Sequence, residues 1–113
     1  MPVDADMDKN YVMELINQCP ANVNASVTVS NGPVTASLFD NQYYRNLLDG
    51  KGLFRSDSVL FTDGRTKGKV QGFSANQDEF FAKWSESFVK LSIIGVKTRE
   101  EGEIRESCMN VNV

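Results

Sequence analysis

Two aspartates stand at positions where a carboxylate could do chemistry. Asp40 precedes an aromatic-rich stretch with helical spacing, and Asp57 lies in a Ser-Asp-Ser triplet ahead of a short apolar run. A carboxylate in such a place could bind a hard cation or accept a hydrogen bond from a neighbouring group. More commonly, an aspartate at the start of a helix only caps its first turn. From the residues alone, helix capping is therefore the simplest interpretation of both.

Histidine is absent from the 113 residues. This absence removes the usual general base near neutral pH and the Ser-His and Cys-His nucleophile pairs. It also removes the most common protein ligand of zinc and haem iron. We therefore expect that this chain does not catalyse a reaction by itself.

The composition is that of one small globular domain. Hydrophobic residues make up 41% of the chain, and fifteen acidic against twelve basic residues leave a net charge of −3. Lysine and arginine are scattered, so there is no basic stripe that could follow a nucleic-acid backbone. No apolar run approaches the ~18 residues of a membrane span, and residues 1–10 lack the features of a secretory signal. We expect neither nucleic acid nor a membrane as a partner.

Two features bear on the cellular compartment. Asn24-Ala25-Ser26 is an N-glycosylation acceptor triplet, which has meaning only in a secreted protein. Cys19 and Cys108 are far apart in the sequence, and a disulfide between them would close a long loop and stabilise the fold. In a cytosolic protein they would instead be buried thiols. The residues alone leave both alternatives open.

The spacing of apolar residues predicts a mostly α-helical chain. Asp8 is expected to cap the first helix and Pro20 to end it, and residues 21–38 are expected to form a long loop with at most a short strand. The predicted helices span residues 8–19, 39–49, 67–73 and 76–91, with a short helical turn at 56–61. The helix at 67–73 is predicted to be weak, because Gly68 and Gly72 each cost about 1 kcal/mol relative to alanine.

The helix at 76–91 has the most pronounced apolar face. Phe80, Trp84, Phe88 and Leu91 recur at helical spacing, and each buried aromatic would contribute roughly 1.5–3 kcal/mol. A stripe of this kind is usually part of a core, so we expect these side chains to be buried against a partner element.

Several segments in order resemble one known family. FDNQYYRNLL, KGLFRSD, FSANQDEFFAKW, IIGVKT and GEIRESC closely resemble the C-terminal part of the secretory plant haem peroxidases, the class III family. The resemblance runs from about Met7 to the terminal Asn-Val and covers roughly the last third of the family's domain. It implies that residues 1–113 form the C-terminal, proximal portion of the mostly α-helical haem-peroxidase fold. By itself, this portion would be incomplete as a domain.

The resemblance gives Asp57 and Asp40 specific roles. Asp57 matches the family's aspartate that accepts a hydrogen bond from the proximal histidine on haem iron, although that histidine is missing here. Alignment on the segment Phe-Asp-Asn places Thr35, the carbonyl of Leu38 and Asp40 at ligand positions of the family's proximal calcium site. Gly32 stands where the family pattern has an aspartate, so one carboxylate of that site is lost.

The resemblance also implies an activity and a compartment. A complete relative would use haem b and calcium, reduce hydrogen peroxide and oxidise phenolic donors by one-electron steps, as in the response to oxidative stress. It would be secreted to the extracellular space or the vacuole, although this chain has no signal peptide. Cys19 and Cys108 would pair with cysteines upstream of this chain rather than with each other. We expect this chain alone to be inactive, because the proximal and distal histidines are absent.

Two other interpretations stay open at the level of the sequence. The chain could be a noncatalytic calcium-binding or partner-binding module that uses Thr35, Leu38 and Asp40. It could also be a small helical domain that is closed by a Cys19–Cys108 bridge.

Overall fold

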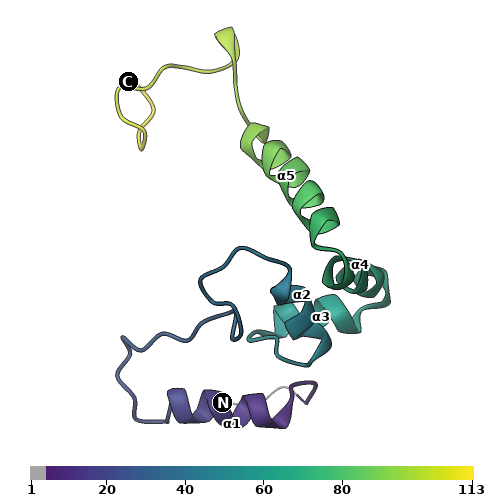
Figure 1. The fold of residues 1–113 in the computed structure, drawn as a ribbon. Coiled ribbons are helices and arrows are strands. Elements are labelled where there is room, and N and C mark those ends of the chain that lie inside the picture. Colours follow the sequence, from purple (N-terminus) through teal and green to yellow (C-terminus); the bar gives the residue numbers. More distant parts are fainter. Residues whose placement is uncertain (1–4) are drawn as a thin grey trace. The chain divides into compact units, whose positions relative to one another are not determined.

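The computed structural model describes residues 5–113 and is helical throughout its regular parts (Figure 1). Its elements are α1 (Lys9–Gln18), α2 (Gln42–Leu48), α3 (Arg55–Thr62), α4 (Gly64–Ala75), α5 (Gln77–Ile93) and the 3-10 helix η1 (Arg99–Glu101). No strand occurs among the described residues, which agrees with the predicted mostly α-helical class. Nor does this part of the chain contain a helix long and apolar enough to cross a membrane.

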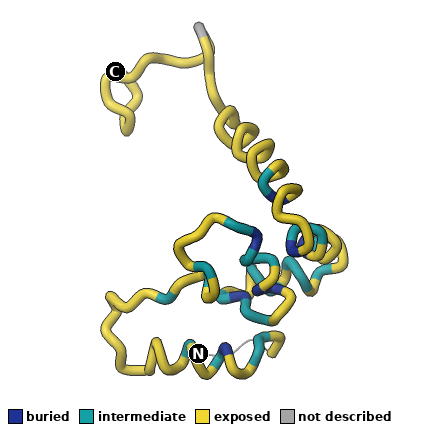
Figure 2. The backbone as a smooth tube through the Cα atoms, viewed as in Figure 1, coloured by how far each residue is buried: buried dark blue, intermediate teal, exposed yellow. Residues whose placement is uncertain are grey.

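The chain divides into two compact units, one that ends at Phe81 and one that begins at Ala82. In the first unit, α2, α3 and α4 contact one another. Most of the buried positions in Figure 2 lie in α2, in α4 and in the first turn of α5, whereas α3 has no buried residue. The core of the first unit is therefore small and centres on α2.

α1 is built as the sequence predicts. The Asp8 carboxylate accepts a hydrogen bond from the backbone N–H of Tyr11 at 2.9 Å, and the helix ends at Gln18, shortly before Pro20. The backbone N–H of Asp8 also donates to the carbonyl of Gly50 at 2.9 Å. Gly50 has a φ of 69°, and a Cβ there would lie 3.0 Å from the Asp8 nitrogen. Only glycine fits this contact between the start of α1 and the end of α2.

α2 begins later than predicted, at Gln42 rather than at residue 39. The buried side chain of Asn41, which is 3% exposed, donates from Nδ2 to the carbonyls of Phe73 (2.8 Å) and Ser74 (3.2 Å) near the end of α4. These bonds satisfy two carbonyls that the last turn of a helix leaves unpaired. A contact with α4 therefore sets the start of α2. The spacing of apolar residues along the chain could not predict this contact.

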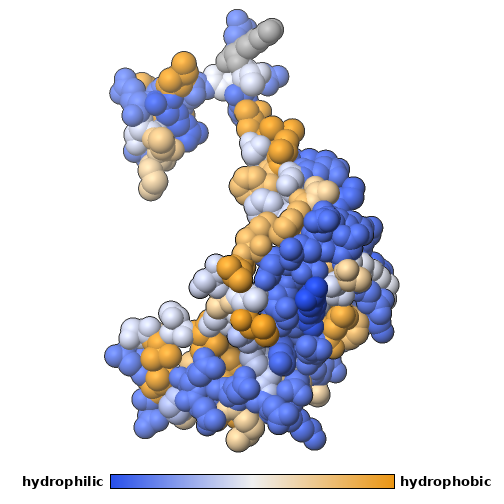
Figure 3. Space-filling view, viewed as in Figure 1, coloured by the Kyte–Doolittle hydropathy of each residue, from blue (hydrophilic) through white to orange (hydrophobic). Residues whose placement is uncertain are grey.

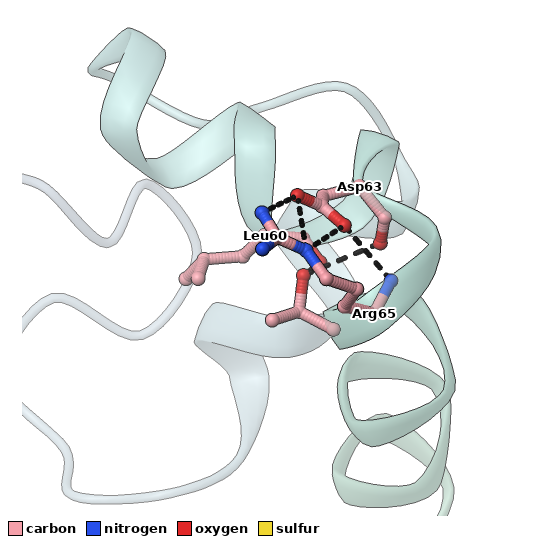
Figure 4. A network of polar contacts seen from close by, with 4 residues as sticks. Leu60, Asp63 and Arg65 are labelled. Atoms are coloured by element: carbon pink, nitrogen blue, oxygen red, sulfur yellow. Dashed lines mark hydrogen bonds and ion pairs between the residues drawn. The ribbon is translucent and has the colours of Figure 1, made fainter.

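α4 is longer than the weak helix predicted at residues 67–73. The Asp63 carboxylate caps it by accepting from the backbone N–H of Arg65 at 2.8 Å, and the Arg65 guanidinium pairs with the same carboxylate at 2.6 Å (Figure 4). The Thr66 hydroxyl donates to the carbonyl of Leu60 at 2.7 Å and joins α4 to α3. The hydrogen bonds from Arg65 lower the pKa of Asp63. The cap and the bond to α3 therefore support the start of a helix that contains two internal glycines.

Five aromatic side chains pack where α2, α4 and α5 meet. Ring centroids lie 5.1–6.0 Å apart within this aromatic cluster, and at 7% exposure Phe80 is buried. Its members are Phe39, Tyr44, Phe73, Phe80 and Phe81. Aromatic pairs at such separations add favourable edge and offset contacts to the area that they bury. The cluster is the main apolar contact between the start of α5 and the helices before it.

The rest of the apolar face of α5 is exposed, so the prediction that it is core is wrong for these residues. Trp84, Phe88 and Leu91 are 42%, 54% and 60% exposed. Trp84 stacks on Phe88 at 4.8 Å. In the unit from Ala82 onward, the structure has η1 and a tail after α5 but no second α-helix that could cover this face. Apolar side chains accordingly gather along α5 and its end in Figure 3.

The long loop predicted at residues 21–38 is present and extends from residue 19 to residue 41, without a strand. Turns within it are closed by backbone hydrogen bonds, from Val23 to Pro20 and from Val27 to Asn24, both at 3.0 Å. Cys19 lies at its start and is exposed, as is Cys108 in the tail, and both thiols are free. The interpretation as buried thiols is therefore wrong, and the structure has no Cys19–Cys108 bridge.

We expect Asn41→Ala to loosen the junction of α2 and α4. The substitution would remove the side-chain donor to the carbonyl of Phe73, at a cost of about 1–3 kcal/mol, whereas the carbonyl of Ser74 would keep its bond from Nε of Arg45 at 3.2 Å. Amide hydrogen exchange at these helix ends should then accelerate roughly 5- to 150-fold. Asn22→Ala, in the exposed loop, is the control and should change nothing; unchanged exchange in Asn41→Ala would contradict this account.

Candidate functional site

Asp57 lies at the third position of α3 and is bound from two sides. Its Oδ2 accepts a hydrogen bond from the backbone N–H of Phe54, the N-cap residue, at 2.9 Å. Its Oδ1 accepts a hydrogen bond from the hydroxyl of Tyr43 in α2 at 2.7 Å. One carboxylate therefore caps its own helix and also ties that helix to α2.

Asp57 caps a helix, as the sequence predicts, but it does so from inside the helix. The bond to Phe54 is the half of a capping box in which the third helical residue reaches back to the N-cap. Phe54 has no side-chain acceptor to return the second bond, and the Ser-Asp-Ser triplet lies inside the helix rather than ahead of it. Since capping uses one oxygen, the other is left for Tyr43.

The segment before α3 is shaped to bring Asp57 close to α2. Gly52 is buried, and a Cβ there would lie 3.1 Å from the Ser58 hydroxyl, 3.2 Å from Cβ of Asp57 and 3.2 Å from Leu47. Contacts that short would force a neighbour to move. The absence of a side chain at Gly52 thus allows close packing of α3 on α2.

The negative charge of Asp57 acts on two tyrosines. Burial is the largest cause that raises the pKa of Tyr43, and the hydrogen bond to Asp57 and the charge of Asp57 raise it further. Burial also raises the pKa of Tyr11, with smaller contributions from the charges of Glu14 and Asp57. Both phenols are therefore held in the neutral form, in which a phenol can donate a hydrogen bond.

Tyr43 is the functional-site residue that sequence reasoning missed. Helical spacing groups Tyr43 only with the apolar residues Phe39 and Leu47, and this spacing assigns no partner to the hydroxyl. The available signal was that a half-buried tyrosine usually finds a hydrogen-bond acceptor. Its acceptor is 14 residues away in the sequence, and helical spacing cannot predict such a contact.

The proposed calcium ligands are brought together only in part. The Thr35 hydroxyl donates to Oδ1 of Asp40 at 3.1 Å, and the backbone N–H of Leu38 donates to the carbonyl of Thr35 at 3.0 Å. Oδ1 of Asp40 also accepts from the backbone N–H of Gln42 at 3.0 Å. Asp40 therefore contacts the first residue of α2 but is not its N-cap, which is Asn41. Within the described residues, no three His, Cys, Asp or Glu side chains are grouped to hold a metal ion.

The chemistry of these donors can be compared with what each cofactor needs. Calcium takes roughly six to eight oxygen ligands, and Thr35, Leu38 and Asp40 supply hard oxygens for a fraction of that number. Haem iron takes a nitrogen, sulfur or phenolate ligand, commonly histidine, which this sequence lacks. An ionised carboxylate has about four acceptor sites, and Asp57 uses two of them on Tyr43 and Phe54. Asp57 can therefore accept one further N–H donor.

Comparison with known proteins gives consistent matches over nearly the whole sequence. A family model described as Peroxidase matches residues 1–76. Peroxidase 46 of Arabidopsis thaliana is 51% identical over 110 residues, which make up 97% of this chain and 34% of that protein. Peroxidase 18 of the same plant is 49% identical over 111 residues, with coverages of 97% and 34%. The chain thus spans about a third of the length of the curated relatives that it matches.

The pKa of Tyr43 provides a test of the site geometry. We expect Asp57→Ala to lower this pKa toward the ordinary value of 10.0, but not fully to it, because burial remains. A raised tyrosine pKa stabilises the fold below pH 10, and that stabilisation is lost as the pH rises through the folded-state pKa. In both proteins this loss begins near the unfolded-state pKa of 10.0, and in the variant it should end at a lower pH and be smaller in total.

NMR titration of the ring carbon of labelled Tyr43 measures this pKa directly. Asp49→Ala, which removes an exposed carboxylate at the end of α2, is the matched control and should leave the titration of Tyr43 unchanged. Identical Tyr43 titrations in the parent chain and in Asp57→Ala would show that the 2.7 Å contact is not formed in solution.

Proposed function

This chain belongs to the peroxidase family of plants, and on that premise we propose that residues 1–113 serve as the C-terminal, proximal portion of a haem-dependent peroxidase. The complete enzyme would bind haem b, reduce hydrogen peroxide to water and take single electrons from phenolic donors. Haem, when bound, supplies the redox chemistry. The residues of this chain would orient and support the groups around it.

The arrangement of Asp57 is the observation that carries this proposal. Its carboxylate is fixed by bonds from α2 and from the N-cap of α3, yet it keeps acceptor capacity for another N–H. A carboxylate so placed suits the task of binding the N–H of a metal-bound imidazole, which fixes the ring and strengthens its donation to the metal. We assign to Asp57 this role toward a histidine supplied from outside these residues.

The exposed apolar face of α5 supports the same proposal. Trp84, Phe88 and Leu91 lie on one side of the helix and are each more than 40% exposed. Burial of such side chains would stabilise an assembly by roughly 1.5–3 kcal/mol each. The matched relatives are about three times as long as this chain. We propose that further parts of a peroxidase domain cover this face.

Calcium would be bound by Thr35, the carbonyl of Leu38 and Asp40, together with oxygen ligands from elsewhere. The contact between the Thr35 hydroxyl and Asp40 supports this assignment, because it brings two of the three donors together before any cation is added. Gly32 lies where a further carboxylate would strengthen the site, so we expect this site to bind calcium weakly.

The exposed thiols and the acceptor triplet favour a secreted protein. Cys19 and Cys108 are accessible for disulfides with cysteines outside these residues, and such bonds persist in oxidising compartments. Asn24 is exposed in a turn in which its side-chain oxygen accepts from the backbone N–H of Ser26 at 3.1 Å. We propose extracellular or vacuolar delivery on these grounds.

A chimaera tests the peroxidase proposal. Residues 1–113 would replace the matching segment of Peroxidase 46, and we expect the product to bind haem and oxidise a phenol with hydrogen peroxide. Asp57→Asn should lower turnover by about 10- to 100-fold, whereas Asp49→Asn should leave it unchanged. Metal analysis of the chimaera and of its Asp40→Asn variant tests the calcium site, since the variant should retain less calcium.

The isolated chain is the comparison for this experiment. Mixed with hemin, it should give no specific haem absorbance and no oxidation of a phenol. Its exposed apolar face on α5 should promote aggregation, or leave folding partial in the unit from Ala82 onward. Robust activity of the isolated chain, a sharp cooperative melt of its monomer, or full activity of Asp57→Asn in the chimaera would each contradict the proposal.

Glycosylation tests the proposed compartment. When the chimaera is expressed through a secretory pathway, we expect Asn24 to carry an N-glycan that peptide N-glycosidase removes with a shift in mass. Asn24→Gln should lack this shift, and Asn22→Gln, two residues away in the same exposed loop, should keep it. A mass unchanged by the enzyme would count against use of this site.

A further inference from the structure

The hydroxyl of Tyr43 occupies one acceptor site of the Asp57 carboxylate, on which the proposed function depends. It donates to Oδ1 of Asp57 at 2.7 Å, while the backbone N–H of Phe54 donates to Oδ2 at 2.9 Å. The bond from Phe54 belongs to α3 itself and would form wherever this helix forms. The bond from Tyr43 comes from a different helix and is made only when α2 and α3 pack together.

The direction of this bond is fixed by its chemistry. An ionised carboxylate has acceptor sites and no proton to donate, so Tyr43 must be the donor. An O–H bond to a carboxylate at this length is charge-assisted and is stronger than a bond between neutral groups. Such a donor draws negative charge toward Oδ1 and reduces the charge with which Asp57 can attract any other N–H.

The surroundings keep this donor in place. The pKa of Tyr43 is raised, first by burial and then by Asp57, so the phenol stays protonated and able to donate at physiological pH. Gly52 lies close to the side chains of both Asp57 and Leu47, because a Cβ at Gly52 would be 3.2 Å from each. Leu47 is 3% exposed, which anchors the same face of α2 that carries Tyr43 one turn earlier.

We propose that Tyr43 is a positioning residue that holds the Asp57 carboxylate toward α2 and limits how strongly it binds the N–H of the iron-ligating imidazole. This inference rests on the proposed role of Asp57. The strength of the imidazole as an iron ligand depends on that hydrogen bond, because the carboxylate partner raises ligand basicity. Through Asp57, Tyr43 would thus tune how strongly that imidazole donates electron density to the haem iron.

The test uses the chimaera with Peroxidase 46 and measures the midpoint potential of its haem. Tyr43→Phe removes only the hydroxyl, so Asp57 should accept more strongly from the imidazole and the potential should become more negative. Asp57→Asn removes the negative charge and should shift the potential in the opposite direction. Tyr44→Phe is the matched control, because Tyr44 is the neighbouring tyrosine in α2 and its ring lies in the aromatic cluster.

Replacement of Tyr43 by 3-fluorotyrosine gives a graded version that preserves packing. A fluorinated phenol is a stronger donor, so the potential should become more positive than in the parent protein. The vibrational frequency of the iron–histidine bond should rise in Tyr43→Phe and fall in the fluorinated protein. Neither the haem potential nor the iron–histidine frequency depends on turnover. A purely structural role of Tyr43 would not shift them in opposite directions in Tyr43→Phe and in the fluorinated protein.

The outcomes separate this inference from the proposed function. Opposite shifts for Tyr43→Phe and Asp57→Asn, with no shift for Tyr44→Phe, would support it. If Asp57→Asn shifts the potential and Tyr43→Phe does not, or shifts it in the same direction, the role of Tyr43 is refuted while that of Asp57 stands. If Asp57→Asn itself causes no shift, both roles fail.

Discussion

The carboxylate of Asp57 links the two helices on which the candidate site depends. α3 needs an acceptor near its first turn, and Asp57 provides one to Phe54. α2 has a half-buried phenol that needs an acceptor, and Asp57 provides one to Tyr43. Because a single side chain meets both requirements, the position of α3 on α2 and the orientation of the carboxylate are determined together.

Asn41 plays a comparable part at the other end of α2. Its buried amide pairs with carbonyls at the end of α4, and the aromatic cluster packs beside it. The short helix α2 is therefore held by polar contacts at its start and by Leu47 and the Gly50 contact at its end. At seven residues α2 would be marginal in isolation, so these tertiary contacts stabilise it.

The exposed face of α5 is the main contrast with this compact region. Its apolar spacing resembles that of a core helix, and its first turn does enter the aromatic cluster through Phe80. Farther along, Trp84, Phe88 and Leu91 are exposed. Matched relatives are about three times as long as this chain. In a larger domain, an apolar helix face of this kind would be covered by another part of the chain. The periodicity therefore describes the helix correctly but not its surroundings.

Sequence alone determined the helical class, the Asp8 cap, the long loop predicted at residues 21–38 and the family, because these depend on local spacing and on residue order. It also gave Asp57 and Asp40 as candidate site residues, whose roles stay predictions. Only the tertiary structure decided the start of α2, the exposure of both cysteines and the pairing of Tyr43 with Asp57. Each of these depends on residues distant in sequence, and local periodicity contains no information about such contacts.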